Sequence, residues 1–464
     1  MAEHARPDAP DLMVDTAVSA RTHELDRAHV FHSWSAQGAL DPMVLAAAQG
    51  CWVWDGQGNR LLDFSSQLVF TNVGHQHPAL VQAITDQVAT LATSAPQHAV
   101  ASRSEAARLI VEQLPGERLQ KVFFTNGGTE AIENAVRMAR LHTGRHKVLS
   151  AYRSYHGHTA TSIHLTGDPR RWPNDTGAAG VVHFFGPYLY RSVFHAQTPE
   201  QESQRALAHL EQVITLEGPS TLAAVVIESV VGTAGVLMPP PGYLAGVREL
   251  CTRHGIMLVI DEVMAGFGRA GTWFGYQHDG AEGLAADPDL VAFAKGVNSG
   301  YVPLGGVAIS TEIAATFAER PYPGGLTYSG HPLAAAAAVA TIELMKHERI
   351  VEHAAEIGEQ VLGPELRALA EQHQVIGEVR GAGVFWALEL VSDRQTREPV
   401  VPYNASGSAN KPMAELVSAC RRRGLLPFVA GNRVHVVPPC TVSEDEARYG
   451  VALLGNALGE VFGG

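Results

Sequence analysis

Two residues of opposite charge stand at the ends of apolar runs, where an ion is costly to bury. Lys295 follows the run LVAFA within DLVAFAKGVNSG, and Asp261 closes the run IMLVID. The chain has only five lysines, so one beside a buried strand calls for an explanation. Burial lowers the pKa of an ammonium group, and the neutral amine then forms Schiff bases with carbonyl compounds. The alternative for Lys295 is a strand end whose side chain reaches water, which is the commoner arrangement of a lone lysine.

A short glycine-rich stretch offers an anion site. In FFTNGGTEAIENAVRMAR an apolar strand is followed by Gly127 and Gly128, and a helix begins near Thr129. The free N–H groups and the positive end of the helix dipole attract anions, while the glycines let a ligand approach the backbone closely. The alternative is an ordinary strand-to-helix turn in which Thr129 only caps the helix.

Together these features fit one cofactor. A phosphate needs an anion site, a protonated pyridine nitrogen needs a buried carboxylate such as Asp261, and an aldehyde needs an amine such as Lys295; pyridoxal phosphate has all three groups. On its own, Asp261 could instead cap the following turn. Two more residues fit: Tyr155 in YRSYHGHT, whose ring could stack on the cofactor ring, and Thr327 in GGLTYSGHP, which could reach the phosphate. The alternative for Thr327 is a surface turn.

Metal ligation is not expected. The pairs His75 and His77, and His156 and His158, have no cysteine or carboxylate partners beside them in the sequence. The four cysteines are scattered and show no CxxC spacing, which suits a reducing compartment and argues against a structural zinc ion.

The composition limits the classes of partner. The chain has 464 residues, of which 46% are hydrophobic and 17% charged, so a sizeable core is expected. Its net charge of −13 argues against nucleic acid, and the densest basic run, RRRG at 421–424, is interpreted as a solvated helix end. No apolar segment follows a basic start, and no run of 18 apolar residues occurs, so we expect a cytoplasmic protein without a membrane span.

The rhythm of apolar residues predicts the elements that position these groups. From about residue 77, apolar strands alternate with helices, which is typical of a mostly parallel sheet covered on both faces. The first 25 or so residues are expected to form a loose arm, and 50–64 a hairpin. The expected strands of the sheet are 121–124, 147–151, 181–185, 222–231, 256–261, 290–294 and 305–310. We divide the chain into an N-terminal arm with part of a small domain (1–76), a large cofactor-binding domain (77–335) and a C-terminal small domain (336–464).

In combination, the motifs resemble those of class III aminotransferases, the ω-aminotransferase branch of fold-type-I pyridoxal phosphate enzymes, and are closest to the taurine and amine:pyruvate types. The resemblance covers the chain from about residue 30 to its end. Its motifs are TNGGTEAIENAVRMAR, YHGHT, IDEVMAGFGRAG, PDLVAFAKGVNSGYVPLGG, GLTYSGHP, VRGAGVFWALEL and VVPP. It implies an α/β fold with a large domain on a seven-stranded, mostly parallel sheet and a smaller α/β domain from the N- and C-terminal segments.

The resemblance implies a role for each matching residue. Lys295 would hold the cofactor aldehyde and then move the proton between the substrate and cofactor carbons, and Asp261 would pair with the ring nitrogen. The other cofactor contacts would be Gly127, Gly128 and Thr129 at the phosphate, Thr327 from the neighbouring subunit, Tyr155 and Val263 on the two ring faces, and Glu228, which is followed by Ser229 in place of the usual proline. The active site would form between two subunits, which implies a homodimer or a dimer of dimers.

Departures from the family pattern narrow the range of expected substrates. Ornithine and 4-aminobutyrate enzymes pair a glutamate with an arginine as a gate for α-carboxylates, and the two matching positions hold Thr233 and His435. The flexible arginine of amine:pyruvate-type members aligns with Phe428. Arg433, or a loop arginine such as Arg153 or Arg170, could substitute for it. The substrate pocket is expected to contain Trp34, Val69, Phe70 and Phe428.

These residues predict a pyridoxal-phosphate-dependent ω-aminotransferase. A primary amine or ω-amino acid would leave its amino group on the cofactor, and a 2-oxo acid, with pyruvate expected, would take it in a second half-reaction. An aminomutase or phospholyase on the same scaffold is the alternative enzyme. A non-catalytic binding protein that retains the fold is a further alternative.

Overall fold

The computed structural model describes residues 7, 12–177, 180–278 and 286–463. Its centre is a seven-stranded sheet with the strand order β4-β10-β9-β8-β7-β5-β6. Only β10 runs antiparallel to its neighbours β4 and β9, and the remaining pairs are parallel. The strands are β4 (Leu119–Thr125), β5 (Lys147–Ala151), β6 (Val181–Phe184), β7 (Leu222–Glu228), β8 (Met257–Asp261), β9 (Leu290–Phe293) and β10 (Gly305–Ser310).

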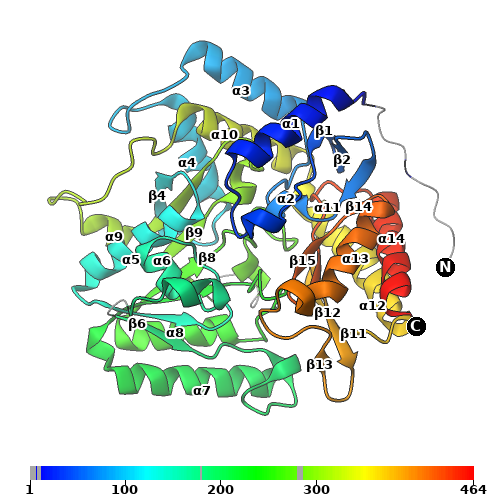
Figure 1. Ribbon diagram of the computed structural model, residues 1–464. Helices are drawn as coiled ribbons and strands as arrows, with labels where there is room; N and C mark the ends of the chain where they lie inside the picture. Colours follow the sequence, from blue (N-terminus) through cyan, green and yellow to red (C-terminus); the bar gives the residue numbers. More distant parts are fainter. Residues whose placement is uncertain (1–6, 8–11, 178–179, 279–285, 464) are drawn as a thin grey trace.

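Helices cover both faces of this sheet, which explains why its strands are apolar almost without interruption (Figure 1). Along β7, Val226 packs in the cluster that contains α5, while Val225 packs in the cluster that contains α7 and α8. Because successive residues of a strand point to opposite faces, both faces of β7 need apolar side chains. The helices of this part are α3 (Pro78–Thr90), α4 (Ala101–Gln113), α5 (Gly128–Thr143), α6 (Ala160–Leu165), α7 (Pro199–Glu217), α8 (Tyr243–His254), α9 (Thr311–Ala315) and α10 (Pro332–His347).

Two smaller sheets join segments from the two ends of the chain. Strand β3 pairs antiparallel with β2 and parallel with β14, so residues near 62 and 425 share one sheet. In the other sheet the order is β11-β12-β16-β15, with β13 also paired to β12. The strands are β1 (Leu45–Gln49), β2 (Trp52–Asp55), β3 (Arg60–Asp63), β11 (Ile376–Ala382), β12 (Phe385–Asp393), β13 (Glu398–Pro399), β14 (Leu425–Leu426), β15 (Phe428–Ala430) and β16 (Arg433–Val436).

Figure 1 shows these sheets beside the C-terminal helices, drawn in yellow to red, on one side of the large sheet. The helices outside the large sheet are α1 (Thr16–His29), α2 (Ser66–Val69), α11 (Ile350–Ile357), α12 (Gly363–Gln372), α13 (Lys411–Arg422) and α14 (Glu444–Phe462). The residue division 1–76, 77–335 and 336–464 stays a prediction.

The predicted fold class is confirmed, and so are the hairpin at 50–64 and the seven strands, apart from small differences at their ends. Arg421 and Arg422 are exposed at the end of α13, as expected for the basic run. The expected loose arm is wrong for residues 16–25, because α1 begins at Thr16. The Asp15 carboxylate accepts hydrogen bonds from the N–H groups of Ala17 and Val18 and so caps this helix.

Candidate active site

A cavity of about 320 Å³ lies at the edge of the large sheet where the parallel strands end. Glu228 closes β7, Asp261 closes β8, and Lys295 follows shortly after β9. Parallel strands present their carboxyl ends at one edge, so residues far apart in sequence meet there. The predicted residues that line this cavity are Phe70, Gly127, Gly128, Thr129, Tyr155, Glu228, Asp261, Val263 and Lys295.

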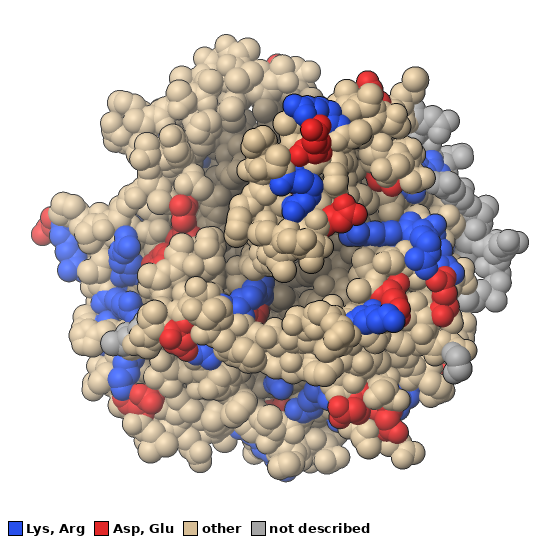
Figure 2. All heavy atoms as spheres, viewed as in Figure 1, with Lys and Arg blue, Asp and Glu red and all other residues tan. Residues whose placement is uncertain are grey.

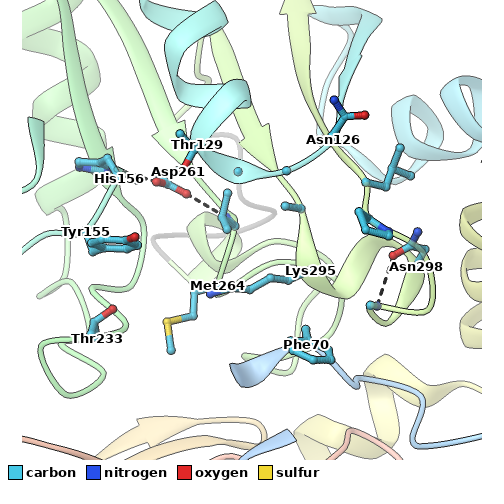
Figure 3. A pocket seen from close by; sticks show the side chains of 18 of the residues that line it. Phe70, Asn126, Thr129, Tyr155, His156, Thr233, Asp261, Met264, Lys295 and Asn298 are labelled. Atoms are coloured by element: carbon cyan, nitrogen blue, oxygen red, sulfur yellow. Dashed lines mark hydrogen bonds and ion pairs between the residues drawn. The ribbon is translucent and has the colours of Figure 1, made fainter. Parts of the chain in front are cut away.

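Lys295 points into the middle of the cavity (Figure 3). Its backbone φ of 50° lies in the left-handed region, which residues with a side chain rarely adopt. The surroundings withhold water from the ammonium group and lower the pKa of Lys295 to about 8, although the nearby carboxylates of Asp261 and Glu228 oppose this shift. A substantial share of the amine is therefore neutral near pH 8.

Asp261 is held by two donors. One carboxylate oxygen accepts the N–H of Val263 at 2.9 Å, and the other accepts Nδ1–H of His156 at 2.8 Å. Burial alone would lower the pKa of His156, but the hydrogen bond to Asp261 and its charge outweigh burial and raise that pKa. An Asp261 carboxylate fixed in this way can face a cationic ring nitrogen.

Glu228 connects two walls of the cavity. Its carboxylate oxygens accept the N–H of Tyr155 at 2.9 Å and the N–H of Gly232 at 2.8 Å. It lies opposite Asp261 in the register of β7 and β8. Burial raises the pKa of Glu228; His156 opposes this shift, whereas the charge of Asp261 adds to it.

The predicted anion site is built from backbone packed too closely for side chains. A Cβ atom on Gly128, the first residue of α5, would lie 2.9 Å from both methyl groups of Val263. A Cβ on Gly157, whose φ is 127°, would lie 2.4 Å from the Thr129 hydroxyl. The start of α5 therefore faces the cavity with its N–H groups and the Thr129 hydroxyl available to an anion.

The donor set fits pyridoxal phosphate. The anion site, the Asp261 carboxylate, the Lys295 amine and the Tyr155 ring surround one cavity, as Figure 3 shows. Within the described residues, no group of three His, Cys, Asp or Glu side chains could hold a metal ion. Over the same ranges, no helix has the length and apolar character needed to cross a bilayer.

Four predicted residues do not line the cavity. Thr327 and Trp34 lie on the surface of the single chain, Trp34 with 65% of its area exposed. Val69 is buried in an apolar cluster to which Phe428 is attached, and the Phe428 ring packs against His435 with 4.5 Å between ring centres. Their contacts with substrate or phosphate remain predictions.

Three polar residues of the cavity are not predicted by the sequence patterns. His156 stands next to Tyr155 in the same motif, but its spacing from His158 suggests only a metal ligand, which is not expected here. Asn126 and Asn298 also line the cavity, and Asn298 donates to the carbonyl of Val302 at 2.6 Å. In the sequence, only the position of Asn126 one residue before the glycine pair, and that of Asn298 three residues after Lys295, indicates that these side chains line the cavity.

No arginine lines the cavity within the described chain, but one approaches it. The guanidinium carbon of Arg170 lies 3.5 Å from the centre of the Tyr155 ring, and its Nε donates to Asp168 at 3.0 Å. Arg153 instead stacks at 5.0 Å over Tyr188, which is not part of the cavity wall. Figure 2 shows a hollow near the centre of the visible face, with mostly uncharged side chains around it.

Solved structures with the same fold define the class of protein. A taurine:2-oxoglutarate aminotransferase from Bifidobacterium kashiwanohense, in complex with pyridoxal phosphate and glutamate, is 37% identical, with a TM-score of 0.90 and coverage of 96% of this chain and 98% of that one. An (S)-enantioselective ω-transaminase from Thermomicrobium roseum is 36% identical, with a TM-score of 0.89 and coverage of 96% and 99%. The fold and site are those of a pyridoxal-phosphate-dependent transaminase.

Residues 35–458 match the family model for aminotransferase class-III, and the chain belongs to this family. A hypotaurine/taurine–pyruvate aminotransferase from Paracoccus denitrificans is 33% identical over 94% of this chain and 96% of its own length. The predicted family, enzyme class and cofactor are thereby confirmed. The aminomutase, phospholyase and non-catalytic alternatives are not favoured, because these similar proteins are aminotransferases.

Proposed function

We propose that this transaminase moves the amino group of a primary amine or ω-amino acid to a 2-oxo acid, with pyruvate as the expected acceptor, in two half-reactions. The observation that carries the proposal is the uncharged wall formed by Thr233 and Met264. Behind it, burial and the positive charge of Arg433 lower the pKa of His435 to about 3, so this imidazole is neutral. A donor with a carboxylate next to its amino carbon would find no cation in this wall.

The residues of the cavity have different roles in cofactor binding and proton transfer. Pyridoxal phosphate, when bound, supplies an aldehyde that accepts amino groups and a ring that draws electrons from the reacting carbon. The turn Gly127–Thr129 would hold its phosphate, Asp261 its ring nitrogen, and Tyr155 one ring face. Lys295 has a pKa of about 8, so its Nζ can both take up and return a proton near that pH.

Arg170 is our proposed partner for the carboxylate of the 2-oxo acid. Its guanidinium group lies over Tyr155, which lines the cavity, and a guanidinium fork binds a carboxylate through two parallel hydrogen bonds. Asp168 occupies one side of this fork and would hold it between substrates. Arg433 is less suited, because its side chain packs against the backbone at Gly235, away from the cavity wall.

We further propose a homodimer or dimer of dimers in the cytoplasm, with Thr327 of one protomer at the phosphate site of the other. Support comes from Thr327 and its neighbour Tyr328, both exposed in the single chain, Tyr328 by 62%. An exposed ring beside a predicted active-site residue is typical of an interface. The four cysteines are unpaired and buried, which suits a reducing compartment.

The test is a panel of donors crossed with two acceptors. Taurine, β-alanine, 4-aminobutyrate and an aryl-alkylamine would each be incubated with pyruvate and with 2-oxoglutarate, because the similar proteins from Paracoccus and Bifidobacterium are named for different acceptors. We expect turnover with at least one of these donors and a preference for pyruvate. Absence of turnover with all four donors would contradict the proposal, and a preference for 2-oxoglutarate would overturn its acceptor.

A further inference from the structure

A compact turn between Val231 and Leu237 forms part of the cavity wall. Val231 and Leu237 exchange two backbone hydrogen bonds, of 3.1 and 3.0 Å, and the Gly232 carbonyl accepts the N–H groups of Gly235 and Val236 at 3.0 Å each. These bonds fix the shape of the turn. They do not fix its place relative to the sheets.

The position of this turn affects two side chains that contact the cavity. Thr233 belongs to the turn and lines the cavity (Figure 3). Met264 lines it too and packs against Gly232 so closely that a Cβ atom there would lie 2.2 Å from its sulfur. A shift of the turn would therefore move or release both side chains.

Three hydrogen bonds from outside hold the turn in place. On the side of the large sheet, Glu228 accepts the N–H of Gly232 at 2.8 Å. On the side of the C-terminal sheet, Nε2–H of His435 on β16 donates to the Gly232 carbonyl at 3.1 Å. Nε of Arg380 on β11 donates to the Gly235 carbonyl at 2.5 Å. Two of the three anchors thus come from the small C-terminal sheet.

Arg380 is itself fixed and has little freedom to bind substrate. Its guanidinium group pairs with Glu389 at 2.9 Å and also with Glu378. Gly235 has a φ of 106°, and a Cβ atom there would lie 2.5 Å from the Arg380 guanidinium. Glycine at this position allows the arginine to reach the backbone.

His435 forms the second anchor without bringing a charge to the wall. It is fully buried, and the Phe428 ring packs on it with 4.5 Å between ring centres. Because the acceptor is a carbonyl, the proton of the neutral imidazole must be on Nε2. The low pKa of His435 keeps the ring in this neutral form near neutral pH.

We propose that His435 is a specificity-determining positioning residue. Its hydrogen bond to Gly232 holds the turn Val231–Leu237, and the turn sets the places of Thr233 and Met264, which limit the size of the amine donor. In enzymes with the α-carboxylate gate this position holds an arginine. Here it holds a neutral histidine that keeps the turn in place. The inference rests on the proposed function, because the size limit is measured with amine donors.

The experiment compares His435→Leu, which fills similar space without a donor, with His435→Gln, whose amide can still donate to the carbonyl. The matched control is His353→Leu, which removes a 2.9 Å bond to the Val442 carbonyl outside the site. The ratio of kcat/KM for a bulky aryl-alkylamine to that for a small alkylamine, with pyruvate, should rise at least about fivefold in His435→Leu. It should stay within about twofold of wild type in the other two variants.

Hydrogen exchange supplies a readout independent of turnover. In the wild-type holoenzyme, amides of the turn should exchange nearly as slowly as those of β7, and they should exchange faster in His435→Leu only. Fast exchange in the wild type would overturn the inference even if the leucine variant failed to fold. An unchanged donor ratio in a folded His435→Leu, or equal shifts in the leucine and glutamine variants, would also overturn it. Absence of transfer from every amine would instead refute the proposed function. The exchange data would then still test whether His435 holds the turn Val231–Leu237 in place.

Discussion

Lys295 has a backbone conformation that is costly for a residue with a side chain, and it places a charged group in a buried site, which is also costly. Both are tolerated where the surrounding structure holds them, and such sites are commonly functional. The lowered pKa of Lys295 leads to a simple consequence. Because the neutral amine is the reactive form, its fraction should rise with pH and level off above about 8.

We therefore expect the rate of pyridoxal phosphate uptake by the cofactor-free enzyme to rise about tenfold between pH 7 and 9 and then level off. An amine with an ordinary pKa would give a rise of about a hundredfold without a plateau. Stopped-flow absorbance measures the rate. Lys295→Ala should retain the fold but show neither uptake by this route nor turnover, whereas Lys346→Ala, which removes an exposed lysine on α10, should behave as wild type.

Arg170 gives a second prediction for a single side chain. Arg170→Met should raise the KM for pyruvate about tenfold or more, with a smaller change in kcat, because a bidentate partner of the carboxylate is lost. Steady-state kinetics at saturating amine measure both constants. Arg171→Met provides the control, since Arg171 lies in the same turn but pairs with Asp175. Equal effects of the two changes would argue against a specific role for Arg170.

Among the secondary-structure elements, β8 is joined at its end to the segment that follows it through Glu262. Its carboxylate accepts the N–H of Gly275 at 2.8 Å and the N–H of Tyr276 at 2.9 Å. Burial raises the pKa of Glu262 to about 7. A carboxyl group with a raised pKa binds more protons in the folded than in the unfolded state, so its contribution to stability falls as the pH rises from about 4.5 to 7.

In Glu262→Gln this part of the pH dependence should disappear. The variant lacks one acceptor and should be less stable than wild type at pH 5. Because only the wild type loses the Glu262 contribution as the pH rises, the difference in unfolding free energy between wild type and variant should shrink by about 1–3 kcal/mol between pH 5 and pH 8. Denaturant unfolding of the holoenzyme across this range measures the effect. Glu249→Gln on α8, an exposed site, should show no change in slope. If the unfolding free energies of wild type and Glu262→Gln changed in parallel with pH, the raised pKa of Glu262 would be contradicted.

The elements also show what could be read from the sequence. The sequence points to Asp261 and Lys295 because a charge at the end of an apolar strand stands out locally. The pairing of His156 with Asp261 joins residues more than 100 positions apart, and no local pattern carries it. The sequence does not predict the helix at Thr16, because α1 buries almost nothing and so lacks an apolar face that periodicity could reveal.

The exposed position of Thr327 predicts that cofactor binding depends on the assembly of two or more protomers. Thr327→Ala should weaken retention of pyridoxal phosphate at least about fivefold during dialysis, because a hydroxyl at the phosphate is lost. Light scattering should give twice or four times the chain mass of 49.5 kDa. Thr311→Ala, at the start of α9, is a control on another surface. A monomeric enzyme whose Thr327→Ala variant retains all of its cofactor would contradict an active site shared between two protomers.

The parallel pairing of β3 with β14 has a consequence during protein synthesis. Leu62 pairs with Trp52 of β2 within the hairpin, but Leu425, its partner on the other side, leaves the ribosome only some 360 residues later. At typical elongation rates of about 5–20 residues per second, the edge of the N-terminal hairpin stays unpaired for roughly 20–70 seconds. An open edge of that kind invites pairing with other nascent chains. The yield of active enzyme in a cell should therefore depend on chaperones that shield nascent chains and on the speed at which the codons up to and just beyond β14 are translated.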